Sequence, residues 1–518
     1  MKKLLAIFIS IALLSTGWLG WSGLTLLVAL TPLLWISAEA EDSRRGWWQT
    51  FAYALLCFVG WNLSTIWWIG YSTPVGPVAA TFASSLLSMI AFMVFHTISK
   101  KASKALSYTI LISLWITLEY AYTTSDFSWP WLLLGNGLSN DVWAVQWYEF
   151  TGLFGGSLWI LLTNILLFEG VYKSTKLLTI IPGLALAITP LILSTIMFIT
   201  YQEPNKGEVR VSVIQPNIDC YDKFNGSEKT QQELLARLAG EAPKDSQFIV
   251  MPETAIPGHF FETQINNYKY IQRLRDSIAH RDINNMLITG ANTIIRYQSA
   301  DESPTARSYG ENYIDIFNSA ITITPYKRMV GIHHKAKLVI GVEQTPTWIF
   351  KLFKFFVIDL GGVVGQIGRG EEATVFEHDG VKFGTAVCYE GLYGGYYGGF
   401  ARGGAEFMTI ISNDGWWRDT PGHRHLFSMS ALRAIESRRA IARSANTGIS
   451  GFISSRGEII DSLGWGKQGV LTNTIKLNDK LTIYTRYGDY IARLAQFICA
   501  IALLYYLAFR VKQRNYLD

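Results

Sequence analysis

Residues 384–390, GTAVCYE, determine how the second half of this 518-residue chain is interpreted. Small and apolar residues lead into Cys388, and the polar pair Tyr389 and Glu390 follows directly. A short run of this kind that ends in reactive side chains is typical of a strand in an α/β sheet, where functional groups gather at strand ends. The segment therefore predicts a strand that presents a thiol at its carboxyl end.

Six more strand-like runs lie between residues 201 and 487 and alternate with helical patterns near 228–240, 264–281 and 422–439. They are VRVSVIQ near 210–215, FIVMPE at 248–253, MLITGAN at 286–292, SAITIT at 319–324, FMTIISN at 407–413 and ISGFISS at 449–455. Alternating strands and helices predict an α/β fold for this region.

The composition indicates a membrane protein. Charged residues make up 16% of the chain, against about 25% in soluble domains, and 18 residues are Trp. Disordered and collagen-like chains are excluded, and four Cys in 518 residues exclude a disulfide scaffold. The net charge of +5 comes without a long basic run, so we expect no nucleic-acid partner.

Long apolar runs predict about eight transmembrane helices, since about 20 apolar residues cross a bilayer. The expected spans are 4–18, 21–38, 47–70, 76–97, 105–123, 150–170, 177–200 and 490–510. A cleaved signal peptide is the alternative for the N-terminus, with Ala38-Glu39-Ala40 as its cleavage site. The apolar stretch before that site exceeds 30 residues, which is too long for a signal peptide.

The distribution of basic residues predicts the orientation. With the N-terminus in the cytoplasm, the inner segments hold twelve Lys and Arg residues, whereas the outer segments 19–20, 71–75 and 124–149 hold none. We therefore expect a seven-helix membrane domain at 1–200, an extracytoplasmic catalytic domain at 201–487, and a final helix with a cytoplasmic tail at 488–518.

Three polar residues carry the expected chemistry. Glu253 follows FIVMP, Lys335 lies in HHKAKLVIGVE, and Cys388 ends GTAVC. A thiol nucleophile needs a base to take its proton, and the tetrahedral oxyanion needs a cation or an N–H donor. Taken singly, each residue has a plain alternative: a buried structural thiol, a surface carboxylate and a surface ammonium. A disulfide between Cys220 and Cys388 is a further alternative.

The sequence motifs around these residues resemble those of the nitrilase, or carbon–nitrogen hydrolase, superfamily. With eight spans, the resemblance narrows to the apolipoprotein N-acyltransferase family. It extends over nearly the whole chain and is carried by FSWPWLLLGNGLS (127–139), QPNI (215–218), MPETAIP (251–257), VCYEG (387–391), SNDGWW (412–417), RAIESRRAIARSANTGISGF (433–452) and TRYGD (485–489).

The resemblance implies an αββα sandwich, with Glu253 as general base, Lys335 as oxyanion stabiliser and Cys388 as nucleophile. It implies supporting roles for Glu343, Tyr389 and Glu390. The implied ping-pong reaction moves an acyl chain from a phospholipid through a thioester to the amine of a diacylglyceryl lipoprotein. The resemblance also implies that the reaction needs no metal or organic cofactor and that the protein lies in the bacterial inner membrane.

Other residues receive weaker expectations. Asn413 and Trp416 are candidates to line the acceptor pocket or to form a strand-end turn. Segment 347–359, with Trp348, is either a membrane-dipping arm or an amphipathic helix. Glu119 is expected near the outer end of its span, and neither His333–His334 nor His423 with His425 has the spacing of a zinc site. Members of the family commonly have Pro-Phe-Gly directly before the residue that corresponds to Glu343. This chain has Ile340-Gly341-Val342 there, so we expect the loop before Glu343 to pack differently.

Two other functions fit parts of the sequence. A membrane-tethered amidase would use the same three residues on a soluble amide. A transporter or receptor would need polar or broken helices, which the nearly uncharged spans do not supply.

Overall fold

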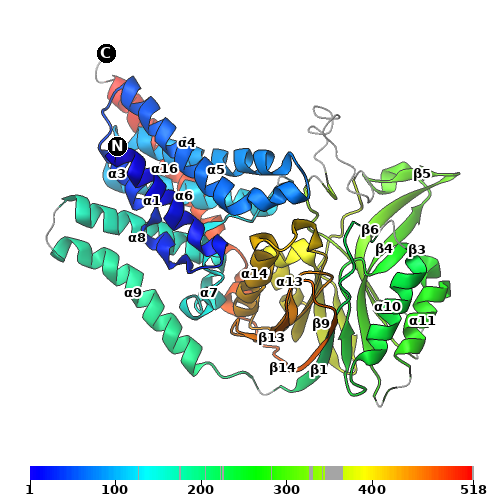
Figure 1. Ribbon diagram of the computed structural model, residues 1–518. Helices are drawn as coiled ribbons and strands as arrows, with labels where there is room; N and C mark the ends of the chain where they lie inside the picture. Colours follow the sequence, from blue (N-terminus) through cyan, green and yellow to red (C-terminus); the bar gives the residue numbers. More distant parts are fainter. Residues whose placement is uncertain are drawn as a thin grey trace. The chain divides into compact units, whose positions relative to one another are not determined.

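A computed structural model describes residues 1–126, 128–173, 177–204, 206–221, 223, 227–279, 281, 283–325, 331–340, 342–344 and 366–515. The chain forms two compact units. The first consists of Met1–Thr200 with Tyr487–Asp518, and the second of Tyr201–Arg486. Figure 1 shows helices throughout the first unit and two sheets in the second.

The first unit is helical. Its helices are α1 (Lys2–Ser15), α2 (Leu26–Ala29), α3 (Thr31–Ala38), α4 (Arg44–Ile66), α5 (Gly76–Ser99), α6 (Lys104–Thr124), α7 (Tyr148–Thr151), α8 (Leu153–Lys173), α9 (Leu177–Thr200) and α16 (Tyr490–Asn515). Within the described residues, six helical segments are long and apolar enough to cross a membrane: Lys2–Leu19, Arg44–Tyr71, Gly76–Ser99, Leu153–Tyr172, Leu178–Thr200 and Tyr490–Gln513.

The two remaining predicted spans are also helical but are less apolar or shorter. The expected span at 105–123 is α6, and the expected span at 21–38 is a shorter apolar helical segment, Gly23–Ala38. The count of eight therefore holds approximately, with six segments meeting the length and composition of a membrane crossing in the described part of the chain.

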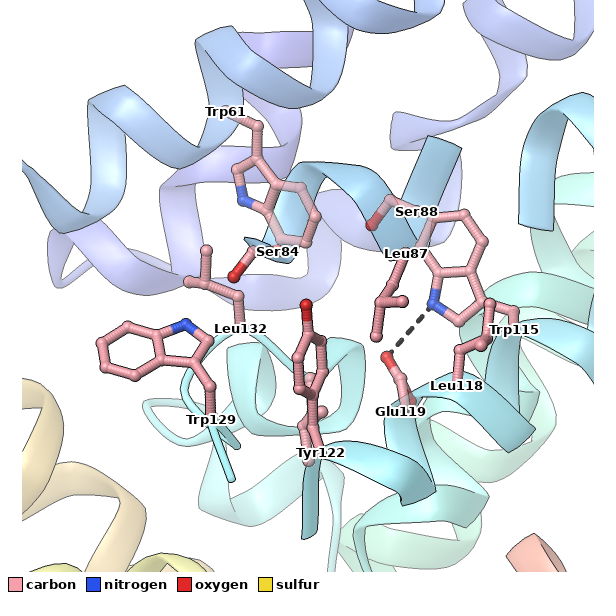
Figure 2. Close-up of a pocket in the computed structure, with 11 residues that line it drawn as sticks. Trp61, Ser84, Leu87, Ser88, Trp115, Leu118, Glu119, Tyr122, Trp129 and Leu132 are labelled. Carbon is pink, nitrogen blue, oxygen red and sulfur yellow. Dashed lines mark hydrogen bonds between the residues drawn. The ribbon is translucent and has the colours of Figure 1, made fainter. Parts of the chain in front are cut away.

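Glu119 lies in α6 and is buried inside the helical unit. Its Oε1 accepts hydrogen bonds from Trp115 Nε1 at 3.2 Å and from the backbone N–H of Leu134 at 2.7 Å. The carboxylate lines a cavity of about 30 Å³, shown in Figure 2, which is room for about two water molecules. Glu119 thus ties the segment that follows α6 back onto the helix.

The second unit contains two sheets. The first has the order β14-β1-β2-β4-β6-β5, with β3 paired to β4 and β7 paired to β6; the second has the order β13-β12-β11-β10-β9-β8. The strands of the first sheet are β1 (Glu208–Gln215), β2 (Phe248–Val250), β3 (Ile256–Phe261), β4 (Met286–Tyr297), β5 (Arg307–Tyr309), β6 (Asn312–Ile323), β7 (Gly331–His334) and β14 (Gly469–Lys476). Those of the second are β8 (Val375–His378), β9 (Val381–Val387), β10 (Phe407–Ser412), β11 (Ile441–Ala445), β12 (Ser450–Ile453) and β13 (Ile459–Leu463).

Helices cover both sheets. The helices of this unit are α10 (Glu228–Glu241), α11 (Lys269–Ser277), α13 (Gly394–Arg402), α14 (Pro421–Ser437) and α15 (Ile483–Tyr487). Leu235 of α10 and Leu274 of α11 share a core with Ile249 and Leu287 of the first sheet. Helices α13 and α14 contact strands of the second sheet. In Figure 1, α10 and α11 lie beside β3 and β4.

Aromatic rings join the two sheets. The ring of Phe248 in β2 lies 5.2 Å from that of Phe383 in β9 and 5.0 Å from that of Phe407 in β10, measured between ring centroids. The second unit is therefore a four-layer αββα sandwich, as the family resemblance implied. Central strands such as β10 are buried along their whole length, which explains their continuous apolar sequence.

Candidate active site

Cys388 lies at the turn between β9 and a short 3₁₀ helix, Cys388–Leu392. Its φ of 51° falls in the left-handed region, which non-glycine residues adopt rarely and at a cost of about 1–3 kcal/mol. Strands β9 and β10 run parallel with Val387 opposite Ile411, so the next residues, Cys388 and Ser412, are neighbours. Ser412 Oγ donates to the thiol Sγ at 3.5 Å.

Glu253 follows β2 in a tight turn whose next residue, Thr254, has a φ of 44°. The turn packs closely on β4: a Cβ added to Gly290 would lie 2.3 Å from the backbone N of Thr254 and 2.6 Å from Cα of Glu253. Glycine at position 290 therefore allows the backbone that carries the carboxylate to approach the neighbouring strand.

Lys335 follows β7 and is 1% exposed. Its Nζ donates to Oε1 of Glu253 and to Oε1 of Glu343, each at 2.9 Å. Asn318 of β6 donates its amide to the same two oxygens, at 2.7 Å to Glu253 and 2.9 Å to Glu343. One ammonium and one amide thus fix both carboxylates in a single hydrogen-bonded group.

The end of β10 connects this group to the thiol. The backbone N–H of Asn413 donates to Oε2 of Glu253 at 2.9 Å. The preceding residue, Ser412, contacts Cys388. Because consecutive Cα atoms lie about 3.8 Å apart, the thiol and the carboxylate belong to one site.

Glu390 holds the backbone on both sides of the site. It accepts the N–H groups of Ala336 and Val387, each at 2.7 Å, and its Oε2 lies 3.1 Å from Nε2 of His333. Ala336 follows Lys335 and Val387 precedes Cys388, so one carboxylate positions the chain next to both groups. The hydrogen bond to Glu390 gives the buried ring of His333 a polar partner.

The other predicted site residues differ in how closely they contact the group formed by Cys388, Glu253 and Lys335. Tyr389 is buried beside the thiol, with its ring 5.5 Å from that of Tyr393. Asn413 takes part through its N–H, and its side-chain oxygen accepts from Asn446 at 3.0 Å. Trp416 is half-buried against Tyr221, with ring centroids 5.3 Å apart. Trp348 and the segment 347–359 lie outside the described residues, as does Gly341.

Burial and charge set the protonation of the site. Burial and the negative charge of Glu253 raise the pKa of Cys388 to about 12, against the opposing effect of Lys335. Burial would raise the pKa of Glu253 and lower that of Lys335, but their mutual attraction and the surrounding hydrogen bonds reverse both effects. The resting site therefore holds a neutral thiol, a carboxylate and an ammonium.

None of the four cysteines forms a disulfide in the structure. All four, including Cys220 and Cys388, are free, so the disulfide alternative is wrong. Among the described residues there is no group of three His, Cys, Asp or Glu side chains that could hold a metal ion.

Four residues of the site were missed by the sequence analysis: Lys223, Asn318, Ser412 and, as a hydrogen-bond partner rather than a metal ligand, His333. Lys223 Nζ donates to the carbonyl O of Glu253 at 2.9 Å and to Thr254 Oγ1 at 2.8 Å. Ser412 stands directly before Asn413 at the end of the predicted strand 407–413. This strand-end position was the signal that could have identified it as a site residue. Asn318 lies one residue before the predicted strand 319–324, which begins earlier, at Asn312.

Comparisons with known sequences agree with this architecture. The carbon–nitrogen hydrolase family matches residues 210–480, and the apolipoprotein N-acyltransferase N-terminal domain matches residues 7–166. An apolipoprotein N-acyltransferase of Chlorobaculum tepidum is 30% identical over 498 residues, covering 92% of this chain and 90% of that relative. The apolipoprotein N-acyltransferase of Geobacter metallireducens is 27% identical and covers 94% and 91%, and that of Thermotoga maritima is 23% identical and covers 97% and 94%.

The fold of the second unit, together with these matches, defines a carbon–nitrogen hydrolase joined to a helical membrane unit. The chain belongs to the apolipoprotein N-acyltransferase family and is a membrane protein.

Proposed function

We propose that this chain transfers an acyl group from a phospholipid, through a thioester on Cys388, to the N-terminal amine of S-diacylglyceryl-cysteine lipoproteins. Two relatives named apolipoprotein N-acyltransferase align with this chain over 90% and 91% of their own length. The observation that carries the proposal is the convergence of Lys335 on Glu253 at 2.9 Å, at the strand end that also contacts the thiol.

In the first half-reaction, the sulfur of Cys388 attacks the sn-1 ester carbonyl of the phospholipid. Glu253 takes the thiol proton, and Lys335 faces the negative charge that develops on the carbonyl oxygen. The ester C–O bond breaks, and Glu253 returns the proton to the leaving alkoxide. The products are an acyl thioester on Cys388 and a lysophospholipid.

In the second half-reaction, the free α-amine of the lipoprotein attacks the thioester carbonyl. A new C–N bond forms and the C–S bond breaks. Glu253 takes a proton from the amine and gives it to the sulfur, so the resting thiol is restored. The pKa of Cys388, raised to about 12 by burial and by Glu253, supports this scheme, because a neutral resting thiol requires a base at each turnover.

Both proposed substrates are lipids, and we place the catalytic unit outside the cytoplasm. The twelve basic residues of the inner segments support an orientation with both termini in the cytoplasm of a bacterial inner membrane. The proposed domains are residues 1–200, 201–487 and 488–518. Single cysteines at Ser72 and Ser103 in a cysteine-free variant test the orientation: an impermeant maleimide added to intact spheroplasts should label position 72 and spare position 103.

Mass spectrometry of the intact chain tests the chemistry. Purified protein incubated with phospholipid alone should gain the mass of one acyl group on Cys388, and this mass should be lost when a diacylglyceryl peptide is added. Cys388→Ala should show neither the added mass nor N-acylation, whereas Cys220→Ala should show both.

Two outcomes would contradict the proposal. Normal N-acylation by Cys388→Ala would exclude the thioester route. Turnover of soluble amides without any acyl transfer between lipids would favour a membrane-tethered amidase of the same superfamily.

A further inference from the structure

Lys223 is a second buried lysine beside Glu253. It is 4% exposed, and its Nζ donates to the backbone carbonyl of Glu253 at 2.9 Å and to Thr254 Oγ1 at 2.8 Å. Its own carbonyl accepts from the side chain of Gln231 at 3.0 Å. The ammonium therefore binds the backbone turn at Glu253 and Thr254. Gly290 packs against this same turn, which carries the Glu253 carboxylate.

A buried ammonium is costly unless an opposite charge lies near it. Both oxygens that Lys223 contacts are neutral, so the negative charge that offsets its burial comes from the carboxylate of Glu253. Burial lowers the pKa of Lys223 to about 8, and the charge of Glu253 opposes that change. In return, Lys223 is one of the charges that lower the pKa of Glu253.

The segment that carries Lys223 is itself anchored to the other side of the site. Asn446 donates its amide to the carbonyl of Ile218 at 2.7 Å and to Oδ1 of Asn413 at 3.0 Å. The backbone N–H of Ile218 donates back to Asn446 at 3.1 Å. The chain leading to Lys223 and the Asn413 N–H that binds Glu253 are thus joined through one asparagine.

We propose that Lys223 is a positioning residue for the reaction: it fixes the backbone of Glu253 and supplies, with Lys335, the positive charge that keeps this carboxylate ionised. This inference rests on the proposed function of Glu253 as the base. Lys335 donates a hydrogen bond to the carboxylate of Glu253. Lys223 instead donates to the backbone carbonyl of Glu253 and acts on the carboxylate through its charge.

The other groups that face Glu253 define the charge balance. Lys335 and Lys223 are the cations, Cys388 is the neutral thiol, and Glu343 shares Lys335. Lys223 itself faces Glu253 and Cys220. Loss of Lys223 leaves two carboxylates opposite one ammonium, so the protonated form of Glu253 is favoured at a higher pH than before.

The test is the pH dependence of kcat/KM for acyl transfer by the full-length protein, with mixed micelles of phospholipid and a diacylglyceryl peptide. Lys223→Gln keeps an N–H donor and removes the charge, and Lys223→Arg keeps the charge. We expect the acid limb of Lys223→Gln to move up by about one pH unit and that of Lys223→Arg to stay in place. The control Lys229→Met removes a charge from an exposed lysine in α10 and should leave both rate and limb unchanged.

A uniform fall in rate for Lys223→Gln, with its acid limb at the wild-type pH, would reduce Lys223 to a structural role and overturn the proposal. If Lys223→Gln does not fold, Lys223→Arg decides: an acid limb that shifts upward although the charge is kept would also overturn it. Failure of the proposed function is separate, since it would show as wild-type protein without acyl transfer or as Cys388→Ala with full activity.

Discussion

The backbone N–H of Asn413 donates to Oε2 of Glu253 at 2.9 Å, which joins the second sheet of the α/β unit to the first at the centre of the site. Glu253 and Lys335 come from segments after β2 and β7, whereas Cys388 and Asn413 follow β9 and β10. The carboxylate therefore depends for its orientation on contacts from both sheets, and changes at this junction should be measurable in activity.

Glu253→Gln should lower acyl transfer by at least about 100-fold, because the amide cannot take the thiol proton. The rate of thioester formation on Cys388, followed by mass spectrometry in a single turnover, measures the effect. Glu233→Gln alters an exposed side chain of α10 and serves as the control. Thioester formation at the wild-type rate in Glu253→Gln would exclude Glu253 as the base.

Gly290→Ala should reduce kcat by about 100-fold, since the new Cβ would overlap the backbone of Glu253 and Thr254 and displace the carboxylate. The matched control is Gly240→Ala in α10, where an added Cβ meets no atom within 4 Å and Ala favours the helix. Equal activities of the two variants would show that the turn accommodates the methyl group without moving Glu253.

Ser412→Ala should slow thioester formation about fivefold, because the hydroxyl donates to Cys388 and favours the thiolate. The decrease should appear in the first half-reaction measured with phospholipid alone. Ser277→Ala removes a hydroxyl that bonds within α11 and should have no effect. A decrease confined to the step with the acceptor amine would contradict the assigned contact.

Glu390→Gln should destabilise the protein by about 2–3 kcal/mol at pH 7, since an amide group would face backbone N–H donors that now bind a carboxylate. Burial would raise the pKa of Glu390, but His333 and the N–H groups of Val387 and Ala336 hold the pKa below its usual value. A group whose pKa falls on folding stabilises the protein above its unfolded pKa, and this contribution is lost as the pH falls through the folded value.

The difference in unfolding free energy between wild type and Glu390→Gln should therefore be full above about pH 4.3 and shrink as the pH falls further. Thermal unfolding of the purified full-length protein at a series of pH values measures it. Glu371→Gln, on an exposed side chain, is the control. A difference that does not change with pH would show that the charge of Glu390 contributes nothing.

The alternation of strands and helices predicted an α/β fold, and the family resemblance implied the sandwich. The central strands could be found because they are buried on both faces and so appear as continuous apolar runs, as in β10. Peripheral strands were missed: Ile459–Leu463 (β13) is largely exposed and lacks that signal. The sequence identified three candidate residues, Cys388, Glu253 and Lys335. Each of them ends or follows a predicted strand and lies in a motif that resembles those of the family. Their roles stay proposals.

Lys223 could not be found in this way. It stands in the largely polar stretch DKFNGSEK (222–229), and lysine in such surroundings is normally solvated. Its ammonium is buried by contacts with Glu253 and Thr254, which lie 30 and 31 residues further along the chain. Glu119 illustrates the same limit, since its partner Leu134 N–H belongs to a segment whose path cannot be deduced from apolar periodicity.

The pairing of β1 with β14, from Glu208 opposite Lys476 to Gln215 opposite Gly469, places the first and last strands of the unit side by side. The edge of β1 stays open until the ribosome has delivered residues 469–476. A chain shortened before residue 469 therefore lacks β14, and its first sheet ends at an unpaired β1.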